Sequence, residues 1–280
     1  MRFKMLQQIV DICRGKFFGL DAMVKKHEMM TFVKSYTTMA FGSSHMEHGF
    51  IPNENEINLG SPSQDLYYIY NLYKKFNTPE VKKVLITFSV FSPGDRLICS
   101  GLGGMTIIYK HLYNIPYEDI NIAKEKHYLI LEPFFKHAIK KAQKKLKLKE
   151  NYRGALLERT TMHAQDEETL KKRALLHYKI SQREKIPMEY CKKILEETKQ
   201  NNQEVYFILP PALNSFKNYL PNSDELFKEI YTLVEDFSHA KILNLYDDPS
   251  FSNEDFIDGD HPNESGAIKM TAKMHEFINS

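Results

Sequence analysis

Two short segments near opposite ends of the sequence carry the side chains of a nucleophile and a base. In AFGSSHMEHGF, Ser44 follows an apolar run, and Gly42 lets the chain turn sharply. In FIDGDHPNESG, Asp258 precedes His261 by three residues. A serine hydroxyl becomes a strong nucleophile when a base takes its proton, and a carboxylate on Nδ1 of an imidazole leaves Nε2 free to be that base. The alternative is structural: Gly-Ser-Ser fits a turn and helix cap, Asp258 and Asp260 fit turns, and His261 fits a helix cap.

A third segment, INLGSPSQDLYY, lies between them. Asn58 and Gly60 fit a tight turn from a strand to a helix. Backbone N–H groups around Ser63 would then face a developing oxyanion. Helix capping by Ser63 is the competing interpretation, and both can hold together.

These segments must be held in place by regular secondary structure, and the sequence predicts five strands that could do so. Apolar runs rich in β-branched or aromatic residues and flanked by turn signals indicate buried strands. The runs are Tyr36–Phe41, Glu56–Leu59, Val84–Val90, Val205–Leu209 and Lys241–Leu245.

Helical patterns alternate with these strands. They cover Ser63–Phe76, Ser223–Phe237 and a C-terminal helix for which Asn263 or Ser265 would be the N-cap. Such alternation favours a mostly parallel sheet with ligands at the carboxyl ends of its strands.

The pattern changes over residues 116–203, which are long, helical and rich in Lys, Glu and Leu. We interpret this stretch as a helical insertion within a single domain of residues 1–280. Its run KHAIKKAQKKLKLKE fits a solvated helix face better than a dedicated anion-binding surface.

Composition excludes several classes of protein. The formal charge is +2 with acidic and basic residues interspersed, so we expect no nucleic-acid partner. Cys13, Cys99 and Cys191 lack metal-ligand spacing and are too few for a disulfide framework. We read no signal peptide in the N-terminal residues and no membrane span, and we expect a cytoplasmic location.

In this order the three segments resemble the SGNH/GDSL hydrolase superfamily. The matching residues are Gly42-Ser43-Ser44, Asn58-Leu59-Gly60 through Ser63, and Asp258-Gly259-Asp260-His261. The resemblance implies a three-layer α/β/α fold with a mostly parallel, flavodoxin-like sheet of about five strands. It also implies that Ser44 is the nucleophile, His261 the base and Asp258 its orienting carboxylate, with the backbone amides of Ser44 and Ser63 as oxyanion-hole donors.

The chain departs from that family in its third block, where SVFSPGDR contains no asparagine to serve the oxyanion hole. Ser89 or Ser92 would have to substitute as donors. Losing one well-placed donor costs ~10²-fold or more in rate. The alternative function is therefore a catalytically inactive SGNH-like binding protein in polysaccharide biosynthesis.

The chain is also similar to bacterial SGNH-like proteins associated with surface-polysaccharide modification. This resemblance implies an acylated, glycan-linked or small-molecule substrate for a serine esterase or O-acyltransferase. Hydrolysis would require no cofactor, whereas transfer would use an acyl donor such as acyl-CoA. We expect His45, Gln64 and Asp65 to contact the substrate; the sequence predicts no oligomeric state.

A metal site is the third hypothesis. It would use four residues: His45, His48, Asp258 and His261. We rank it below the serine mechanism because the Ser and Asp-x-x-His order already explains those positions, and we predict no metal.

Overall fold

The computed structural model describes residues 19–146, 148, 151–157 and 166–280. The chain divides into two compact units: Met1–Lys34 with Arg96–Tyr152, and Ser35–Asp95 with Arg153–Ser280. The expected insertion over 116–203 is therefore split between the units, and the single-domain assignment stays a prediction. Cys13 and most of the segment searched for a signal peptide lie outside the described residues.

The second unit is built on one five-stranded sheet. Its strands are β1 (Thr38–Phe41), β2 (Glu56–Asn58), β3 (Lys83–Thr87), β4 (Glu204–Leu209) and β5 (Ala240–Asn244). Their order is β2-β1-β3-β4-β5, and every neighbouring pair is parallel. This is the flavodoxin-like order, so the predicted sheet is confirmed.

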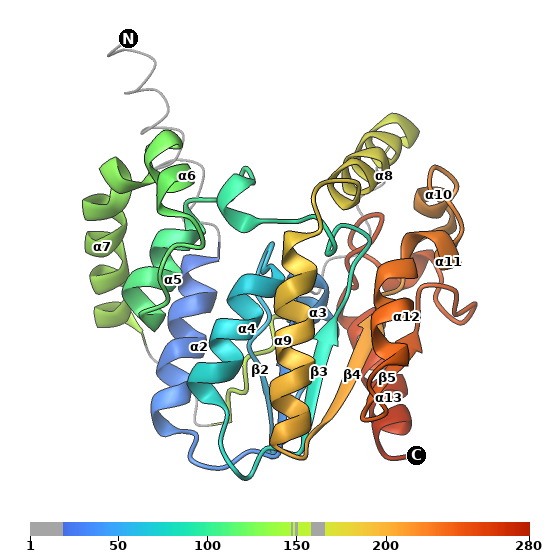
Figure 1. The fold of residues 1–280 in the computed structure, drawn as a ribbon, viewed down its shortest axis with the longest axis horizontal. Helices are drawn as coiled ribbons and strands as arrows, with labels where there is room; N and C mark the ends of the chain where they lie inside the picture. The colour runs from blue at the N-terminus through green and yellow to red at the C-terminus, as the bar shows by residue number, and fades with distance from the viewer. Residues whose placement is uncertain (1–18, 147, 149–150, 158–165) are drawn as a thin grey trace. The chain divides into compact units, whose positions relative to one another are not determined.

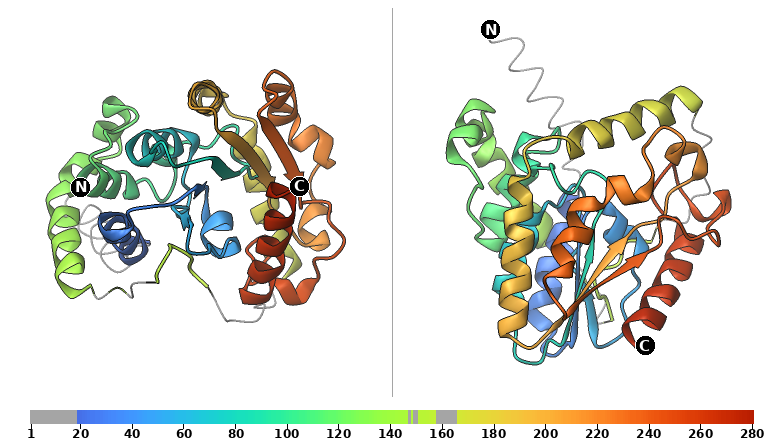
Figure 2. Two further views of the ribbon diagram at one scale, coloured as in Figure 1. Left: turned by 90° about the horizontal axis from the view of Figure 1, so that it is seen from below. Right: turned by 45° about the vertical axis from the view of Figure 1, so that its right-hand side comes forward.

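Helices cover both faces of this sheet (Figures 1 and 2). Those on one face are α3 (Ser44–Gly49) and α13 (Glu264–Ile278), which contact each other. Those on the other are α4 (Leu66–Phe76), α9 (Ile186–Gln200) and α12 (Lys228–Glu235). The three-layer α/β/α architecture is thereby confirmed. The remaining helices of this unit are α8 (Glu167–Ser181), α10 (Asn214–Lys217), α11 (Ser223–Leu226) and the 3₁₀ turn η2 (Asn253–Asp255).

The core between the sheet and the α3/α13 layer consists of alternate residues of the strands and the segments that follow them, two residues from α3 and its C-terminal end, and one stripe of α13. Its buried members are Ala40, Met46, Phe50, Leu85, Tyr206, Ile208, Leu245, Met270, Met274 and Ile278. Because side chains alternate along a strand and recur every three or four residues along a helix, both elements turn one apolar side inward. This packing anchors α3 and α13, the two helices that adjoin the chemical segments.

Most strand bounds differ from expectation by one or two residues, and three other differences have a clear local cause. Helix α4 begins at Leu66 rather than at Ser63, because Ser63 has a left-handed φ of 49° and Asp65 caps the helix through Tyr68 N–H at 3.0 Å. The helix expected over 223–237 is interrupted at Phe227, where φ is −110°. Strand β3 ends at Thr87, because a turn follows in which Ser92 N–H donates to the carbonyl of Ser89 at 2.9 Å.

The first unit is helical where it is described. Its elements are α2 (Leu20–Phe32), η1 (Leu97–Cys99), α5 (Met105–Tyr113), α6 (Ile120–Glu125) and α7 (Tyr128–Lys145). Helices α2, α5 and α7 contact one another, and Tyr113 Oη donates to the carbonyl of Met23 at 2.9 Å. On α7, Leu131, Phe135 and Ile139 are buried, whereas its lysines are exposed, as a solvated lysine face requires.

Two further observations concern the described residues as a whole. Cys99 and Cys191 form no disulfide with a described residue. No described helix combines the length and the apolar character needed to cross a bilayer.

Candidate active site

Ser44 owes its position to the turn at Gly42. Gly42 has a φ of 145°, and a Cβ at this residue would lie 1.9 Å from Thr87 Oγ1 at the end of β3. Its N–H donates to Gln64 Oε1 at 2.9 Å. Ser43 then takes the N-cap position, and Ser44 is the first residue of α3. A half-buried serine therefore lies at the carboxyl edge of the sheet, next to its central strand.

The loop that carries Asp258 and His261 is closed by backbone hydrogen bonds. Ile257 N–H donates to the carbonyl of His261 at 2.8 Å, and Asn263 N–H donates to the carbonyl of Asp255 at 2.9 Å. The Asn263 side chain also caps α13 through Gly266 N–H at 3.1 Å, which confirms one of its two expected caps. These contacts tie the loop to a helix packed on the core.

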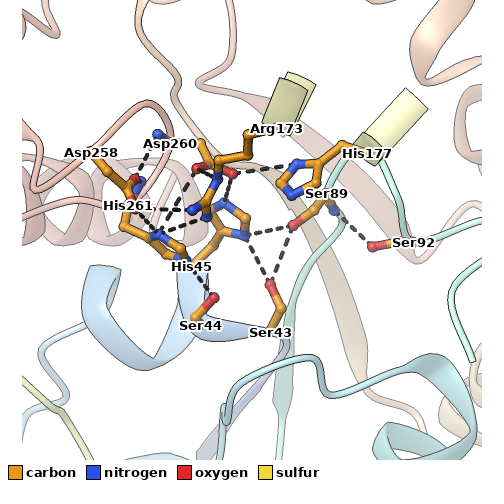
Figure 3. Close-up of polar contacts among 10 residues, drawn as sticks. All are labelled: Ser43, Ser44, His45, Ser89, Ser92, Arg173, His177, Asp258, Asp260 and His261. Carbon is orange, nitrogen blue, oxygen red and sulfur yellow. Dashed lines mark hydrogen bonds and ion pairs between the residues drawn. The ribbon is translucent and has the colours of Figure 1, made fainter. Parts of the chain in front are cut away.

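Within this loop, Asp258 is held by the backbone and faces His261. Its Oδ1 accepts from the N–H groups of Asp260 at 3.1 Å and His261 at 2.9 Å. Its Oδ2 lies 2.8 Å from His261 Nδ1. On the far side of the ring, His261 Nε2 lies 2.6 Å from Ser44 Oγ (Figure 3). The structure thus places the three residues in one hydrogen-bonded path, although 217 positions separate the serine from the histidine.

Electrostatics favour the charged carboxylate and a basic imidazole. Burial acts to lower the pKa of His261, but the nearby Asp260 and Asp258 outweigh it and raise that pKa. Burial acts to raise the pKa of Asp258, but the hydrogen bond and charge of His261 outweigh it and lower that pKa. An ionised Asp258 fixes the proton on Nδ1 and leaves the Nε2 lone pair toward Ser44.

A second group of polar residues, which we call the Asp260 cluster, adjoins this path. It consists of Asp260, His45, Arg173 and His177 (Figure 3). His45 Nε2 lies 3.0 Å from Asp260 Oδ2, Arg173 Nε lies 2.8 Å from Asp260 Oδ1, and His177 Nδ1 lies 3.5 Å from Asp260 Oδ2. Burial acts to raise the pKa of Asp260, but Arg173 and the surrounding imidazoles outweigh it and hold that pKa well below its usual value.

His45 is a neutral member of the cluster. Burial lowers its pKa, and Asp260 offsets that effect only in part. Since Nε2–H donates to the Asp260 carboxylate, Nδ1 accepts from hydroxyls, and both Ser43 Oγ and Ser89 Oγ lie 2.9 Å from it. His45 therefore links α3 to the turn after β3.

Arg173 reaches from α8 to both aspartates. Its Nη1 lies 3.2 Å from Asp258 Oδ2, and its Nη2 lies 3.0 Å from His261 Nδ1. A guanidinium has donors only, so it and Asp258 compete for that nitrogen. The ionised carboxylate is the stronger partner for an Nδ1–H. Arg173 contacts the two carboxylates as an ion pair, and the geometry between its Nε and Asp260 Oδ1 is not that of a hydrogen bond.

The expected oxyanion donors differ in their surroundings. Ser89 Oγ lies 2.9 Å from His45 Nδ1, to which its hydroxyl donates, whereas Ser92 Oγ only accepts, from Ser89 N–H at 2.9 Å, so that contact does not use the Ser92 hydroxyl proton. Ser63 is half-buried in the turn before α4. The roles expected of these residues and of the Ser44 amide stay predictions.

The expected substrate contacts have structural tasks. Gln64 is buried, and its Nε2 donates to the carbonyl of Leu59 at 2.9 Å while its Oε1 accepts from Gly42. Asp65 caps α4. His45 is 2% exposed and belongs to the Asp260 cluster. Substrate contact by these three residues stays a prediction.

Within the described part of the chain, one group brings potential metal ligands together. Atoms of Asp258, Asp260 and His261 lie within 4.8 Å of one another. The guanidinium of Arg173 contacts both carboxylates there and already supplies the compensating positive charge. His48, a member of the metal site considered from the sequence, instead meets His261 edge to face at 5.9 Å.

A small cavity lies beside the cluster, at the carboxyl ends of β3, β4 and β5. It has about 10 Å³ for the centre of a water-sized sphere, which is room for about one water molecule. Its lining includes His45, His177, Asp260 and Tyr246. The Tyr246 hydroxyl is buried there and has no hydrogen-bond partner among the described residues.

Sequence reasoning did not identify Arg173 or His177 as site residues, and it assigned Asp260 only to a turn. Arg173 and His177 are four residues apart and so share one face of α8. That spacing was the available signal, but in a chain with 38 lysines and arginines it does not distinguish this pair from others.

Comparisons with known proteins give one kind of match. No protein-family model and no curated protein sequence matches the chain. Several solved structures are similar, among them Axe2, an acetylxylan esterase from Geobacillus stearothermophilus, with 9% identity, a TM-score of 0.40 and coverage of 89% of this chain and 96% of that one. A catalytic mutant of the same esterase has 9% identity and a TM-score of 0.40, covering 87% of this chain and 94% of that one.

Proposed function

We propose that this chain is a serine esterase or O-acyltransferase that forms an acyl-enzyme on Ser44. The observation that carries the proposal is the path from Ser44 Oγ to His261 Nε2 at 2.6 Å and from His261 Nδ1 to Asp258 Oδ2 at 2.8 Å. Both distances are within hydrogen-bond reach, as a nucleophile, its base and the residue that orients the base require.

The proposed reaction has two steps. In the first, His261 Nε2 takes the proton of Ser44 Oγ, which bonds to the carbonyl carbon of an ester. When the tetrahedral intermediate collapses, the ester C–O bond breaks and the leaving alcohol receives the proton from His261. In the second, the imidazole takes a proton from water or from an acceptor hydroxyl, whose oxygen bonds to the acyl carbon. The bond from that carbon to Ser44 Oγ then breaks, and Ser44 Oγ receives the proton from His261.

The oxyanion would be stabilised by backbone donors. We assign this role to the N–H groups of Ser44 and Ser63, in keeping with the SGNH resemblance. Because the Ser89 hydroxyl donates to His45, a third donor from the turn after β3 would have to be the Ser92 hydroxyl, in place of the asparagine that the family uses. We therefore expect turnover to be slow relative to enzymes with a complete set of donors.

The proposed substrate is an acyl ester on a glycan or on a small molecule. The resemblance to bacterial proteins of surface-polysaccharide modification supports this choice. A cytoplasmic enzyme of this kind would act on an activated or lipid-linked sugar, and as a transferase it would take its acyl group from a thioester such as acyl-CoA.

The test is covalent labelling with a fluorophosphonate, together with hydrolysis of phenyl acetate. The variants are Ser44→Ala and the matched neighbour Ser43→Ala, whose hydroxyl faces His45 instead of His261. We expect mass spectrometry to place the label on Ser44 in the wild type and in Ser43→Ala, and we expect no label and no hydrolysis in Ser44→Ala.

The other outcomes would overturn the proposal. Labelling at Ser43 would move the nucleophile to the neighbouring serine. No labelling and no hydrolysis in any folded variant would favour the inactive binding protein. If labelling succeeds, adding a sugar alcohol to the hydrolysis reaction distinguishes the two acceptors, because a transferase yields an acylated sugar and an esterase yields acetate.

A further inference from the structure

Asp260 is a buried carboxylate that the proposed mechanism does not use. It is 3% exposed, and its oxygens face nitrogens from two helices, α3 and α8. Burying a carboxylate is unfavourable unless opposite charges and hydrogen bonds compensate it. An asparagine would also accept the His45 hydrogen bond without that cost. The charge at this position therefore calls for an explanation beyond packing.

The partners of Asp260 lie on two sides of His261. The His45 ring is stacked on the His261 ring, with centroids 5.0 Å apart and planes 18° apart. Arg173 places Nη2 3.0 Å from His261 Nδ1. Asp260 contacts both of these residues, and its own Oδ1 lies 3.9 Å from the same Nδ1. A neighbour of the His261 ring on α3 and another on α8 are thus both in contact with Asp260.

We propose that Asp260 is the positioning carboxylate of this site, which holds His45 and Arg173 against His261 and so keeps that ring aligned between Ser44 and Asp258. The proposal deepens the function proposed above and rests on it for any effect on rate. The effect on His261 itself does not depend on enzyme activity. Arg173 comes from the stretch interpreted as an insertion, so the role also assigns a task to α8.

Asp260 and Arg173 act on the pKa of His261 in opposite directions. A carboxylate near an imidazole favours the protonated ring, whereas a guanidinium disfavours it. The other groups that interact with His261 are Asp258 on its own loop, His177 on α8, and His45 and His48 on α3. Burial lowers the pKa of His177 to about 4 and also lowers that of His45, so both are neutral near neutrality.

The experiment is an NMR titration of the His261 Cε1–H signal in the full chain, with that signal assigned from a His261→Gln variant. We expect Asp260→Asn to lower the pKa of His261 and Arg173→Gln to raise it. A general loss of packing would not produce shifts of opposite sign. The matched controls are Asp236→Asn, at an exposed residue that ends α12, and Lys172→Gln, next to Arg173 in an exposed surface pair with Glu168. Each control removes the same charge and should leave the titration unchanged.

The second readout is the rate of fluorophosphonate labelling at a pH where His261 is neutral in every variant. We expect Asp260→Asn to slow labelling by about 10- to 100-fold, since a misalignment of about 1 Å is enough for such a loss. Shifts of the same sign, or no shift, would overturn the inference. If Asp260→Asn does not fold, Arg173→Gln alone decides: a His261 pKa that does not rise in this variant would also overturn the inference.

The outcomes separate the two proposals. Opposite shifts without any labelling of the wild type would refute the proposed function and leave the positioning role of Asp260 intact. Labelling of Ser44 without opposite shifts would refute the positioning role alone.

Discussion

Replacing Asp258 with asparagine tests whether this carboxylate decides which nitrogen of His261 carries the proton. The new amide has two orientations. Its oxygen can stay on the backbone N–H groups of Asp260 and His261, which Asp258 Oδ1 now accepts at 3.1 and 2.9 Å. Reversing it would lose both hydrogen bonds, at about 1 kcal/mol each, and would press an NH₂ group against two N–H donors. The first orientation is therefore strongly favoured.

That orientation turns the NH₂ group toward His261 Nδ1, which Asp258 Oδ2 now faces at 2.8 Å. Nδ1 must then be an acceptor, and Arg173 Nη2, 3.0 Å away, favours the same state. The ring proton moves to Nε2, which would donate to Ser44 and could no longer take its proton. A general base contributes ~10²- to 10⁴-fold, so we expect labelling and hydrolysis to fall by about 10³-fold, or about 4 kcal/mol of activation free energy.

The assay compares second-order rate constants of fluorophosphonate labelling for the wild type, Asp258→Asn and the exposed control Asp236→Asn. Because the substitution keeps the backbone hydrogen bonds, the variant should unfold at a urea concentration close to that of the wild type. A folded Asp258→Asn protein that labels within about tenfold of the wild-type rate would refute the reasoning, because the carboxylate would then not determine the tautomer.

Three further predictions follow from the geometry. Hydrolysis of phenyl acetate should fall as pH decreases, because the reaction needs neutral His261. Burial acts to lower the pKa of His261, but Asp260 and Asp258 outweigh it and raise that pKa. A pH–rate profile should therefore show its acid limb above 6.5. Gly42→Ala should lower the free energy of unfolding by about 2–6 kcal/mol, because of backbone strain and a Cβ placed 1.9 Å from Thr87 Oγ1. Urea denaturation measures this, with Gly101→Ala as the control, since a Cβ there meets nothing within 4 Å. Equal losses of stability in the two variants would contradict the prediction. Tyr246→Phe should leave the free energy of unfolding unchanged or raise it by up to about 1 kcal/mol, because the buried hydroxyl has no partner in the described chain; a loss above that size in the same assay would indicate a water bound in the adjoining cavity.

The sheet could be predicted from the sequence because each strand is a short apolar run between turn signals. All five predicted runs overlap an observed strand, and errors fall at the ends. The third strand was predicted to continue to Val90 because the residues Phe88-Ser89-Val90 are typical of a strand. The hydrogen bonds between Ser89 and Ser92 that follow the strand depend on local geometry that composition does not specify. The break at Phe227 is of the same kind, since the helical pattern continues through it.

For the candidate site, the sequence predicted the residues that belong to short segments with a recognisable order. Ser44, Asp258 and His261 are brought together, and their catalytic roles stay predictions. The Asp260 cluster could not be predicted, because the contacts that define it join α8 to a loop more than 80 positions later in the chain. Nothing in the local sequence marks one of the seven arginines as the partner of two aspartates.

The parallel sheet also has a consequence for how the chain is made. Residue 83 of β3 pairs with residue 204 of β4, so one edge of β3 stays open while about 120 residues are added. At roughly 5–20 residues per second this takes about 6–24 s. During that time the apolar edge is a template for pairing with other chains. The ribosome-bound intermediate is therefore the species most prone to aggregate, and chaperone supply during synthesis, more than the stability of the finished protein, should limit its soluble yield.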